Sequence, residues 1–350
     1  MESDRVRIAI ATNSLGKSVA GHDIHSKLTA AKVHGFDGVE LAFECLEAHA
    51  SSATLAGNGT REDQLRSAAG DIQRKASTFS LDIISLNPFG AYDGLLESKD
   101  IESRLQEAEL WLQLCEILHA PILQSCCCIY PVQKSLTPDI NRIAMNMRRL
   151  GLLAQKYNKI VAYEAVAWGI HIDTWQQSRD IIALVGLPNV RLCLDTFHIA
   201  AKEAGDPFNA AAPVRPDGLR RLSESLSEMR RTIQPSDIGY LQLSDATVAD
   251  PDQRGYPRRD LNQPPFMTQS RNCRIFPCEP HYGGTLPALD VAKSIFDMGY
   301  RGWVSMEVFH IDMWKRDPSI PGEWARRGMA SWREVTASCG LQSPSIAAKL

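Results

Sequence analysis

The feature that most constrains the fold is a regular alternation of two kinds of segment along nearly the whole chain. Short apolar runs alternate with longer stretches in which apolar residues recur at helical spacing. Strands that alternate with helices indicate a parallel sheet, and eight such strands favour a (β/α)8 TIM barrel over an open doubly wound sheet. The expected strands are RIAIAT (7–12), GVELAF (38–43), DIISLNPF (82–89), APILQSCC (120–127), IVAYEAVAW (160–168), VRLCLDTFH (190–198), IGYLQLSDA (238–246) and WVSMEVF (303–309).

The pattern predicts one α/β domain over residues 1–340, followed by a loose C-terminal tail at 341–350. The chain has 350 residues, of which 44% are hydrophobic, and this is ample for one large core. No glycine-rich dinucleotide motif follows the first expected strand, so a nucleotide-binding fold is disfavoured. The Pro- and Arg-rich stretch 246–285 is expected to be a long loop over the C-terminal face of the barrel, where TIM-barrel active sites lie. A second irregular stretch is expected at 203–219.

Composition argues against several classes of function and location. A formal net charge of −3 offers no basic surface for nucleic acid, and no apolar run approaches the roughly 20 residues that span a membrane. The N-terminal residues do not resemble a secretory signal, so we expect a cytoplasmic protein with reduced cysteines. The last three residues, Ala348-Lys349-Leu350, resemble a peroxisomal signal with Ala in place of Ser, which leaves that location as an alternative.

Four of the expected strands place an oxygen-bearing polar side chain near their C-terminal end. These residues are Glu164, Asp195, Gln242 and Glu307. An unpaired buried charge is costly, so acids at such positions need a partner. The strand ends of a barrel meet at one mouth, and four oxygen ligands there predict a single divalent cation such as Mg²⁺, Mn²⁺ or Co²⁺.

Other polar and aromatic residues lie where they could contact a ligand on this cation. His198 follows Asp195 by three residues and is a candidate acid or base. Arg271 and Arg274 lie in the long loop, and either guanidinium could bind a substrate carboxylate through two hydrogen bonds. Asn87 and Trp168 are expected to form part of the pocket wall.

Several of these segments together resemble the fungal 3-dehydroshikimate dehydratases of quinate catabolism, within the xylose isomerase-like barrel superfamily. The resemblance extends from about residue 6 to about residue 336. Its segments are S-L-G (14–16), A-G-H (20–22), N-P-F with Y-D-G (87–94), Y-E (163–164), C-L-D-T-F (193–197), Y-L-Q-L-S-D-A (240–246), S-R-N-C-R-I-F (270–276) and G-W-V-S-M-E-V-F (302–309).

The resemblance implies a metal-dependent hydro-lyase that converts 3-dehydroshikimate, a small carboxylate, to protocatechuate and water. It implies that the four strand-end residues are metal ligands, with Glu164 and Glu307 also serving catalysis. It places His198 near the substrate, and one Arg of the S-R-N-C-R segment on the substrate carboxylate. Some relatives have an arginine where this chain has Gly90, so a substrate contact is lost or supplied elsewhere. Other relatives have a histidine where this chain has Val166, which makes His198 the better candidate base.

Three alternatives remain at this stage. The same barrel and ligands serve sugar isomerases and epimerases and inosose dehydratases, but a neutral sugar would not need the two loop arginines. An endonuclease of this barrel type would need more histidine ligands and a basic groove. A non-catalytic binding protein would not need all four metal-binding positions.

Overall fold

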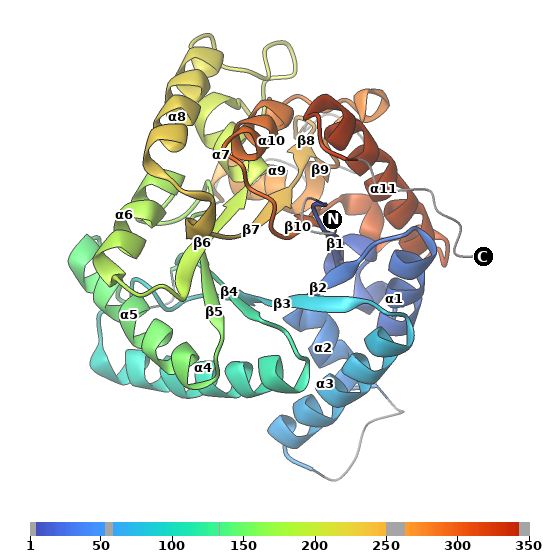
Figure 1. Cartoon of the computed structure of the whole chain (residues 1–350), viewed down its shortest axis with the longest axis vertical. Helices are drawn as coiled ribbons and strands as arrows, with labels where there is room; N and C mark the ends of the chain where they lie inside the picture. The colour runs from blue at the N-terminus through green and yellow to red at the C-terminus, as the bar shows by residue number, and fades with distance from the viewer. Residues whose placement is uncertain (1–4, 53–58, 133, 250–262, 343–350) are drawn as a thin grey trace.

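Eight parallel strands close into a barrel at the centre of the molecule, in the order β1-β10-β7-β6-β5-β4-β3-β2 (Figure 1). The computed structural model describes residues 5–52, 59–132, 134–249 and 263–342. The predicted (β/α)8 TIM barrel is confirmed, and each barrel strand lies within one of the eight expected runs. The strands are β1 Ile8–Ala11, β2 Gly38–Ala42, β3 Asp82–Phe89, β4 Ile122–Cys126, β5 Ile160–Glu164, β6 Val190–Asp195, β7 Ile238–Leu243 and β10 Val304–Met306.

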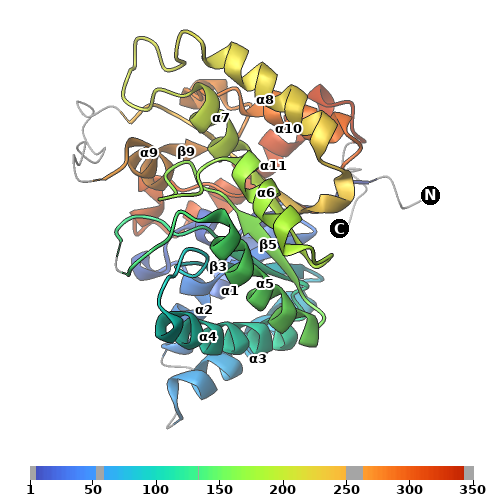
Figure 2. The same ribbon diagram turned by 90° about the vertical axis from the view of Figure 1, so that its left-hand side faces the viewer.

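Helices surround the barrel as an outer layer (Figures 1 and 2). Local sequence signals set their ends, as α6 illustrates: Thr174 and Gln177 form a capping box at its start, and Gly186 ends it in the left-handed conformation with a φ of 61°. The helices of this layer are α1 Ile24–Val33, α2 Phe43–Ala50, α3 Arg61–Thr78, α4 Ser98–Ile117, α5 Ile140–Lys156, α6 Trp175–Val185, α7 Thr196–Ala204, α8 Gly218–Thr232, α10 Ala288–Asp297 and α11 Ile320–Ser338.

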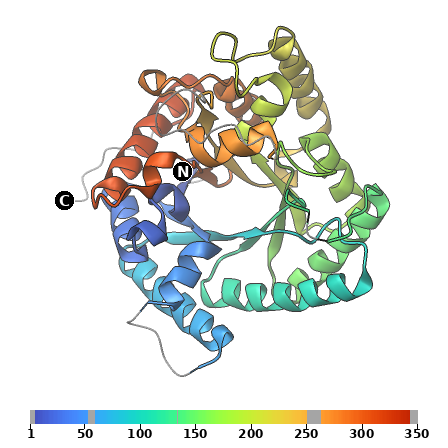
Figure 3. The ribbon, with the colours of Figure 1, turned by 180° about the vertical axis from the view of Figure 1, so that it is seen from behind.

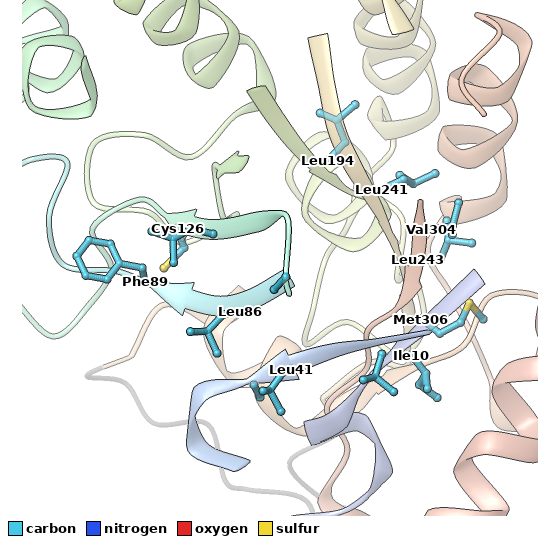
Figure 4. Close-up of a cluster of buried hydrophobic side chains, with 14 of the residues drawn as sticks. Ile10, Leu41, Leu86, Phe89, Cys126, Leu194, Leu241, Leu243, Val304 and Met306 are labelled. Carbon is cyan, nitrogen blue, oxygen red and sulfur yellow. The ribbon is translucent and has the colours of Figure 1, made fainter. Parts of the chain in front are cut away.

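The core has two layers because successive side chains of a strand point to opposite faces. Large apolar residues such as Ile10, Leu194 and Met306 lie in the layer between strands and helices (Figure 4). The other set has fewer members and fills the inside of the barrel. Its members are Ala9, Ile84, Ile122, Ala162, Cys193 and Tyr240. Two residues beyond Ala162 and Cys193 the same face reaches Glu164 and Asp195, so the alternation of the strands directs these acids into the mouth of the barrel.

The segment expected to be a long loop at 246–285 contains regular structure, which corrects that expectation. Helix α9, Pro265–Cys273, leads into β9, Arg274–Ile275, and β9 pairs antiparallel with β8, Asp245–Ala246. Figure 3 shows α9, in orange, crossing the barrel. The expected position over the mouth is therefore right for the described part of this segment, in which a short ribbon and a helix replace the expected loop. The other irregular stretch is confirmed, because α7 ends at Ala204, α8 begins at Gly218, and no helix or strand lies between them among the described residues.

The ends of the chain and the location of the protein remain predictions. The tripeptide Ala348-Lys349-Leu350 lies outside the described residues, as does most of the expected tail. Within the described part of the chain, no helix has both the length and the apolar character needed to cross a membrane.

Asp245 of β8 makes the stability of this ribbon sensitive to pH. Its Oδ1 accepts hydrogen bonds from the amides of Ala246 at 2.6 Å and Leu286 at 2.9 Å, but burial raises the pKa of Asp245 from 3.8 to about 7. The folded state therefore holds a proton that the unfolded chain releases at lower pH. Its contribution to stability is complete below pH 4 and is lost as the pH rises through 7.

We therefore expect Asp245→Asn to gain stability relative to the wild type, by up to a few kcal/mol, as the pH rises from about 4 to 8. Asparagine keeps an acceptor for the two amides without acquiring a charge. Urea unfolding of both proteins at each pH would measure the difference. A difference that stays constant across this range would show that Asp245 does not titrate as described.

Candidate functional site

A cavity of about 700 Å³ opens at the C-terminal ends of the barrel strands. The strand ends and the loop after β5 form its floor and one wall, and α9 and β9 form another wall. Seven of the residues expected at the site line it: Asn87, Glu164, Trp168, His198, Arg271, Arg274 and Glu307. Asp195 and Gln242 are buried but do not line the cavity.

Glu164, Asp195 and His198 form a compact buried group. Their ligand atoms all lie within 4.8 Å of one another. His198 Nε2 is 3.6 Å from Glu164 Oε1 and 3.7 Å from Asp195 Oδ2. The two acids end neighbouring strands, and His198 lies in the first turn of α7, directly after Asp195. The predicted meeting of strand-end acids is thus found for this pair, with a histidine as the third member.

The guanidinium of Arg274 lies against this group. One of its terminal nitrogens is 2.7 Å from Asp195 Oδ2 and 3.1 Å from Glu307 Oε2, and the other is 2.6 Å from His198 Nε2. Only 1% of Arg274 is exposed. Arg274 therefore joins Glu307 to the group and supplies a fixed positive charge among the carboxylates.

The three carboxylates are difficult to ionise together. Burial raises the pKa of Glu164 well above its ordinary value, and the charges of Glu307 and Asp195 add to the increase. Burial likewise raises the pKa values of Glu307 and Asp195, and Arg274 opposes both increases. One guanidinium does not neutralise three buried acids, so the group retains an attraction for a further positive charge.

The ring of His198 is held in a defined orientation. The amide of Ala167 donates to Nδ1 at 3.0 Å, and Trp168 lies edge-on against the ring at 4.9 Å between centroids. Burial lowers the pKa of His198 well below its ordinary value, and Arg274 adds to this effect, so the ring is neutral. A neutral imidazole accepts at only one nitrogen. Nδ1 faces the amide of Ala167 and Nε2 faces the guanidinium of Arg274, and both of these groups can only donate, so the neutral ring can accept from one of them at a time.

Gln242 is oriented by a buried acid that the sequence analysis missed. Glu40 Oε1 accepts from Gln242 Nε2 at 3.0 Å, from Asn87 Nδ2 at 2.8 Å and from the hydroxyl of Tyr240. The carbonyl oxygen of Gln242 accepts from the thiol of Cys193 at 3.2 Å. The structure therefore places Gln242 in a network beneath the acidic group, with its oxygen on Cys193.

The donor set fits a divalent cation. Glu164 Oε1 is buried and makes no hydrogen bond. The side-chain carbonyl oxygens of Asn87 and Gln124 are also buried without a hydrogen bond. All three residues line the cavity. Gln124, also missed from the sequence, donates to Glu164 Oε2 at 2.5 Å and leaves Oε1 free. A buried oxygen without a partner is costly, and a cation at this point would remove the cost.

The two arginines expected to bind substrate have different surroundings. Arg274 is engaged with the acidic group, whereas Arg271 is exposed on α9 and lines the cavity. No hydrogen bond or ion pair is found for Arg271 among the described residues. Arg271 therefore has its guanidinium available to an anion, and Arg274 would first have to change partners.

Comparison with known proteins is consistent with this architecture. A family model described as a xylose isomerase-like TIM barrel matches residues 28–335. The chain belongs to this family. A 3-dehydroshikimate dehydratase of Neurospora crassa is 33% identical over 336 residues, which cover 94% of this chain and 93% of that protein.

Two further matches involve longer proteins. A 3-dehydroshikimate dehydratase of Pseudomonas putida is 26% identical over 302 residues, covering 86% of this chain and 38% of that protein. The solved structure of a xylose isomerase-like TIM barrel/4-hydroxyphenylpyruvate dioxygenase fusion protein matches with a TM-score of 0.71 at 23% identity. It covers 96% of this chain and 43% of that chain, and it shows the likeness of the fold.

Proposed function

We propose that this protein is a 3-dehydroshikimate dehydratase, which forms protocatechuate and water. The observation that supports this most directly is the 33% identity to the Neurospora crassa dehydratase along nearly the full length of both proteins. The cavity agrees with it, because Arg271 lines the same space as two of the buried acids, Glu164 and Glu307. The guanidinium of Arg271 suits the carboxylate of the substrate, and the buried acids suit a cation that binds its hydroxy-ketone.

Glu164, Asp195 and His198 are the residues brought together where a divalent cation would bind, with Glu307 beside them. The expected ligand set had Gln242 in place of His198. Gln242 joins this set if its carbonyl oxygen leaves Cys193. When bound, the cation would supply Lewis-acid polarisation of the substrate ketone, which makes the neighbouring C–H more acidic. The inclusion of an imidazole nitrogen is compatible with Mn²⁺ or Co²⁺ as well as Mg²⁺.

We assign the two proton transfers to Glu164 and His198. Glu164 Oε1 has no partner, so it is the carboxylate that can accept the α-proton. His198 Nε2 lies 3.6 Å from Glu164 Oε1 and 2.6 Å from the guanidinium of Arg274, so His198 is the second group proposed to carry a proton at the reacting centre.

Substrate orientation is the role proposed for the cavity wall. Arg271 binds the carboxylate, and Asn87 and Trp168 border the ring. Arg274 holds Asp195 and Glu307 in place in the described geometry and is the second candidate for the carboxylate. A neutral-sugar isomerase or epimerase would leave Arg271 without a partner, and this favours an acidic substrate.

We expect purified protein to convert 3-dehydroshikimate to protocatechuate when Mg²⁺, Mn²⁺ or Co²⁺ is present. Protocatechuate absorbance would report the reaction, and EDTA should abolish it by removing the cation. Failure with every metal would contradict the dehydratase proposal. Full activity in EDTA would contradict the metal site while leaving the reaction intact.

A further inference from the structure

A buried lysine and a buried cysteine lie together on the barrel side formed by α1 and α2. Lys27 Nζ is 3.1 Å from the sulfur of Cys45 and 3.1 Å from the hydroxyl of Ser18, in the short helix η2, Ser18–Ala20. Lys27 is 0% exposed and Cys45 is 2% exposed. Within the described ranges, no carboxylate forms an ion pair with Lys27. The amine thus has a hydroxyl and a sulfur as its hydrogen-bond partners.

This arrangement favours a charged pair. A buried ammonium without an anion carries a penalty of several kcal/mol. A neighbouring ammonium stabilises a thiolate, and the Cys45 sulfur is a direct hydrogen-bond partner of the Lys27 amine. An ammonium–thiolate pair satisfies both groups without any other residue. The thiolate is also the reactive form of cysteine.

We propose that Lys27 and Cys45 form an oxidation-sensitive site at which a covalent nitrogen–sulfur bond joins α1 to α2. Hydrogen peroxide is the oxidant. The Cys45 thiolate attacks one peroxide oxygen, the O–O bond breaks, and the Lys27 ammonium gives a proton to the leaving hydroxide. The products are the Cys45 sulfenic acid, the neutral Lys27 amine and one water.

The second step is a condensation. The neutral amine attacks the sulfenic sulfur, the S–O bond breaks, and the hydroxyl leaves with one amine proton as a second water. Sulfenic acids condense with nitrogen in this way to give sulfenamides. The amine is already in contact with the sulfur, so the reaction needs no movement of the backbone. A thiol reductant reverses it by attacking the sulfur.

The pair lies beside a partly exposed residue, and a bond between its members would have a consequence for the candidate active site. Ser18 is partly exposed, and its hydroxyl is 3.6 Å from the Cys45 sulfur. Lys17 precedes Ser18 in the chain, and Glu44 precedes Cys45. Both residues line the main cavity, and they form an ion pair with 2.9 Å between Lys17 Nζ and Glu44 Oε1. The new bond would therefore fix α1 to α2 directly behind one wall of the candidate active site.

Cys115 provides a matched comparison within the same chain. It is also buried, but its sulfur donates a hydrogen bond to the carbonyl of Ile122 at 3.9 Å. Burial raises the pKa of Cys115 to about 12, so it remains a thiol. Cys45 and Cys115 are therefore similar in burial. They differ in that Cys45 has the Lys27 amine 3.1 Å from its sulfur.

Peptide mapping by mass spectrometry after peroxide treatment of the full chain would test the proposal. We expect a linked peptide containing Lys27 and Cys45, lighter than its two components by two hydrogen atoms, with no trypsin cleavage at Lys27. Dithiothreitol should restore both peptides. Cys115 should stay unmodified in the same sample.

Two variants give the controls. Cys45→Ser should yield no link, and Lys27→Arg should keep the positive charge and give a Cys45 sulfenic acid that dimedone traps. Absence of the link in the wild-type chain, while Cys278 or Cys339 is oxidised, would overturn the proposal without requiring either variant to fold. A linked peptide that retains an oxygen atom would overturn the condensation step.

Discussion

Replacement of Glu164 by glutamine is expected to lower kcat/KM for dehydration by about 10³-fold, which corresponds to about 4 kcal/mol of lost transition-state stabilisation. The substitution preserves size, so Gln124 can still donate to the remaining carbonyl oxygen in place of Oε2. The other position then presents an amide NH2 where Oε1 faces His198. A donor there repels a cation and cannot accept a proton. Steady-state kinetics, with Mn²⁺ affinity from titration calorimetry, would measure both losses.

The matched control is Glu228→Gln. Glu228 lies on α8 and pairs with Arg179 at 2.7 Å, and it does not line the cavity. We expect its kinetics and Mn²⁺ affinity to equal those of the wild type. If Glu164→Gln kept wild-type metal affinity but lost activity, Glu164 would be a base without being a ligand. If it kept both, the assignment of the site would be wrong.

The fold was predictable because the strands and helices follow local patterns. Every barrel strand is an apolar run of a few residues, and the count of eight allowed few topologies. The segment 246–285 was harder, since β8 and β9 are two residues each and too short to show alternation. Their pairing depends on contacts between Asp245 and Ile275, which are distant in sequence.

The site was partly predictable for the same reason. Glu164, Asp195 and Glu307 were found because a carboxylate at the end of an apolar strand is unusual. Glu40 shows the same signal within GVELA, and the same rule applied to every strand would have found it. Gln124 shows a weaker form, an amide within ILQSC. The four chosen residues were those on adjacent strands, which left out the opposite side of the barrel.

Side-chain partners could not be predicted from the sequence. Nothing in the spacing of Arg271 and Arg274 shows that one is exposed and the other buried among acids. The two differ because Arg274 begins β9 and its side chain faces the barrel, whereas Arg271 lies on the last turn of α9. The hydrogen bond from Ala167 to His198 likewise depends on the path of the loop after β5.

Arg274→Met should destabilise the metal-free protein by about 3–5 kcal/mol, because Asp195 and Glu307 lose their buried counter-charge. A divalent cation bound beside them would replace that charge. We therefore expect saturating Mn²⁺ to stabilise this variant more than it stabilises the wild type, which already has the guanidinium in place. Urea unfolding with EDTA and with Mn²⁺ would give the four free energies of unfolding.

Arg271→Met is the control from the same segment. Arg271 is exposed and engages no acid of the cluster, so its loss should change stability by about 0.5 kcal/mol or less, with or without Mn²⁺. It should instead raise KM for 3-dehydroshikimate, because the free guanidinium is the one proposed to bind the carboxylate. Equal Mn²⁺ stabilisation of Arg274→Met and the wild type would mean that the cation binds away from Asp195 and Glu307. A raised KM in Arg274→Met with an unchanged KM in Arg271→Met would assign the carboxylate to Arg274, and metal binding would then have to release that arginine from the acids before the substrate could be held.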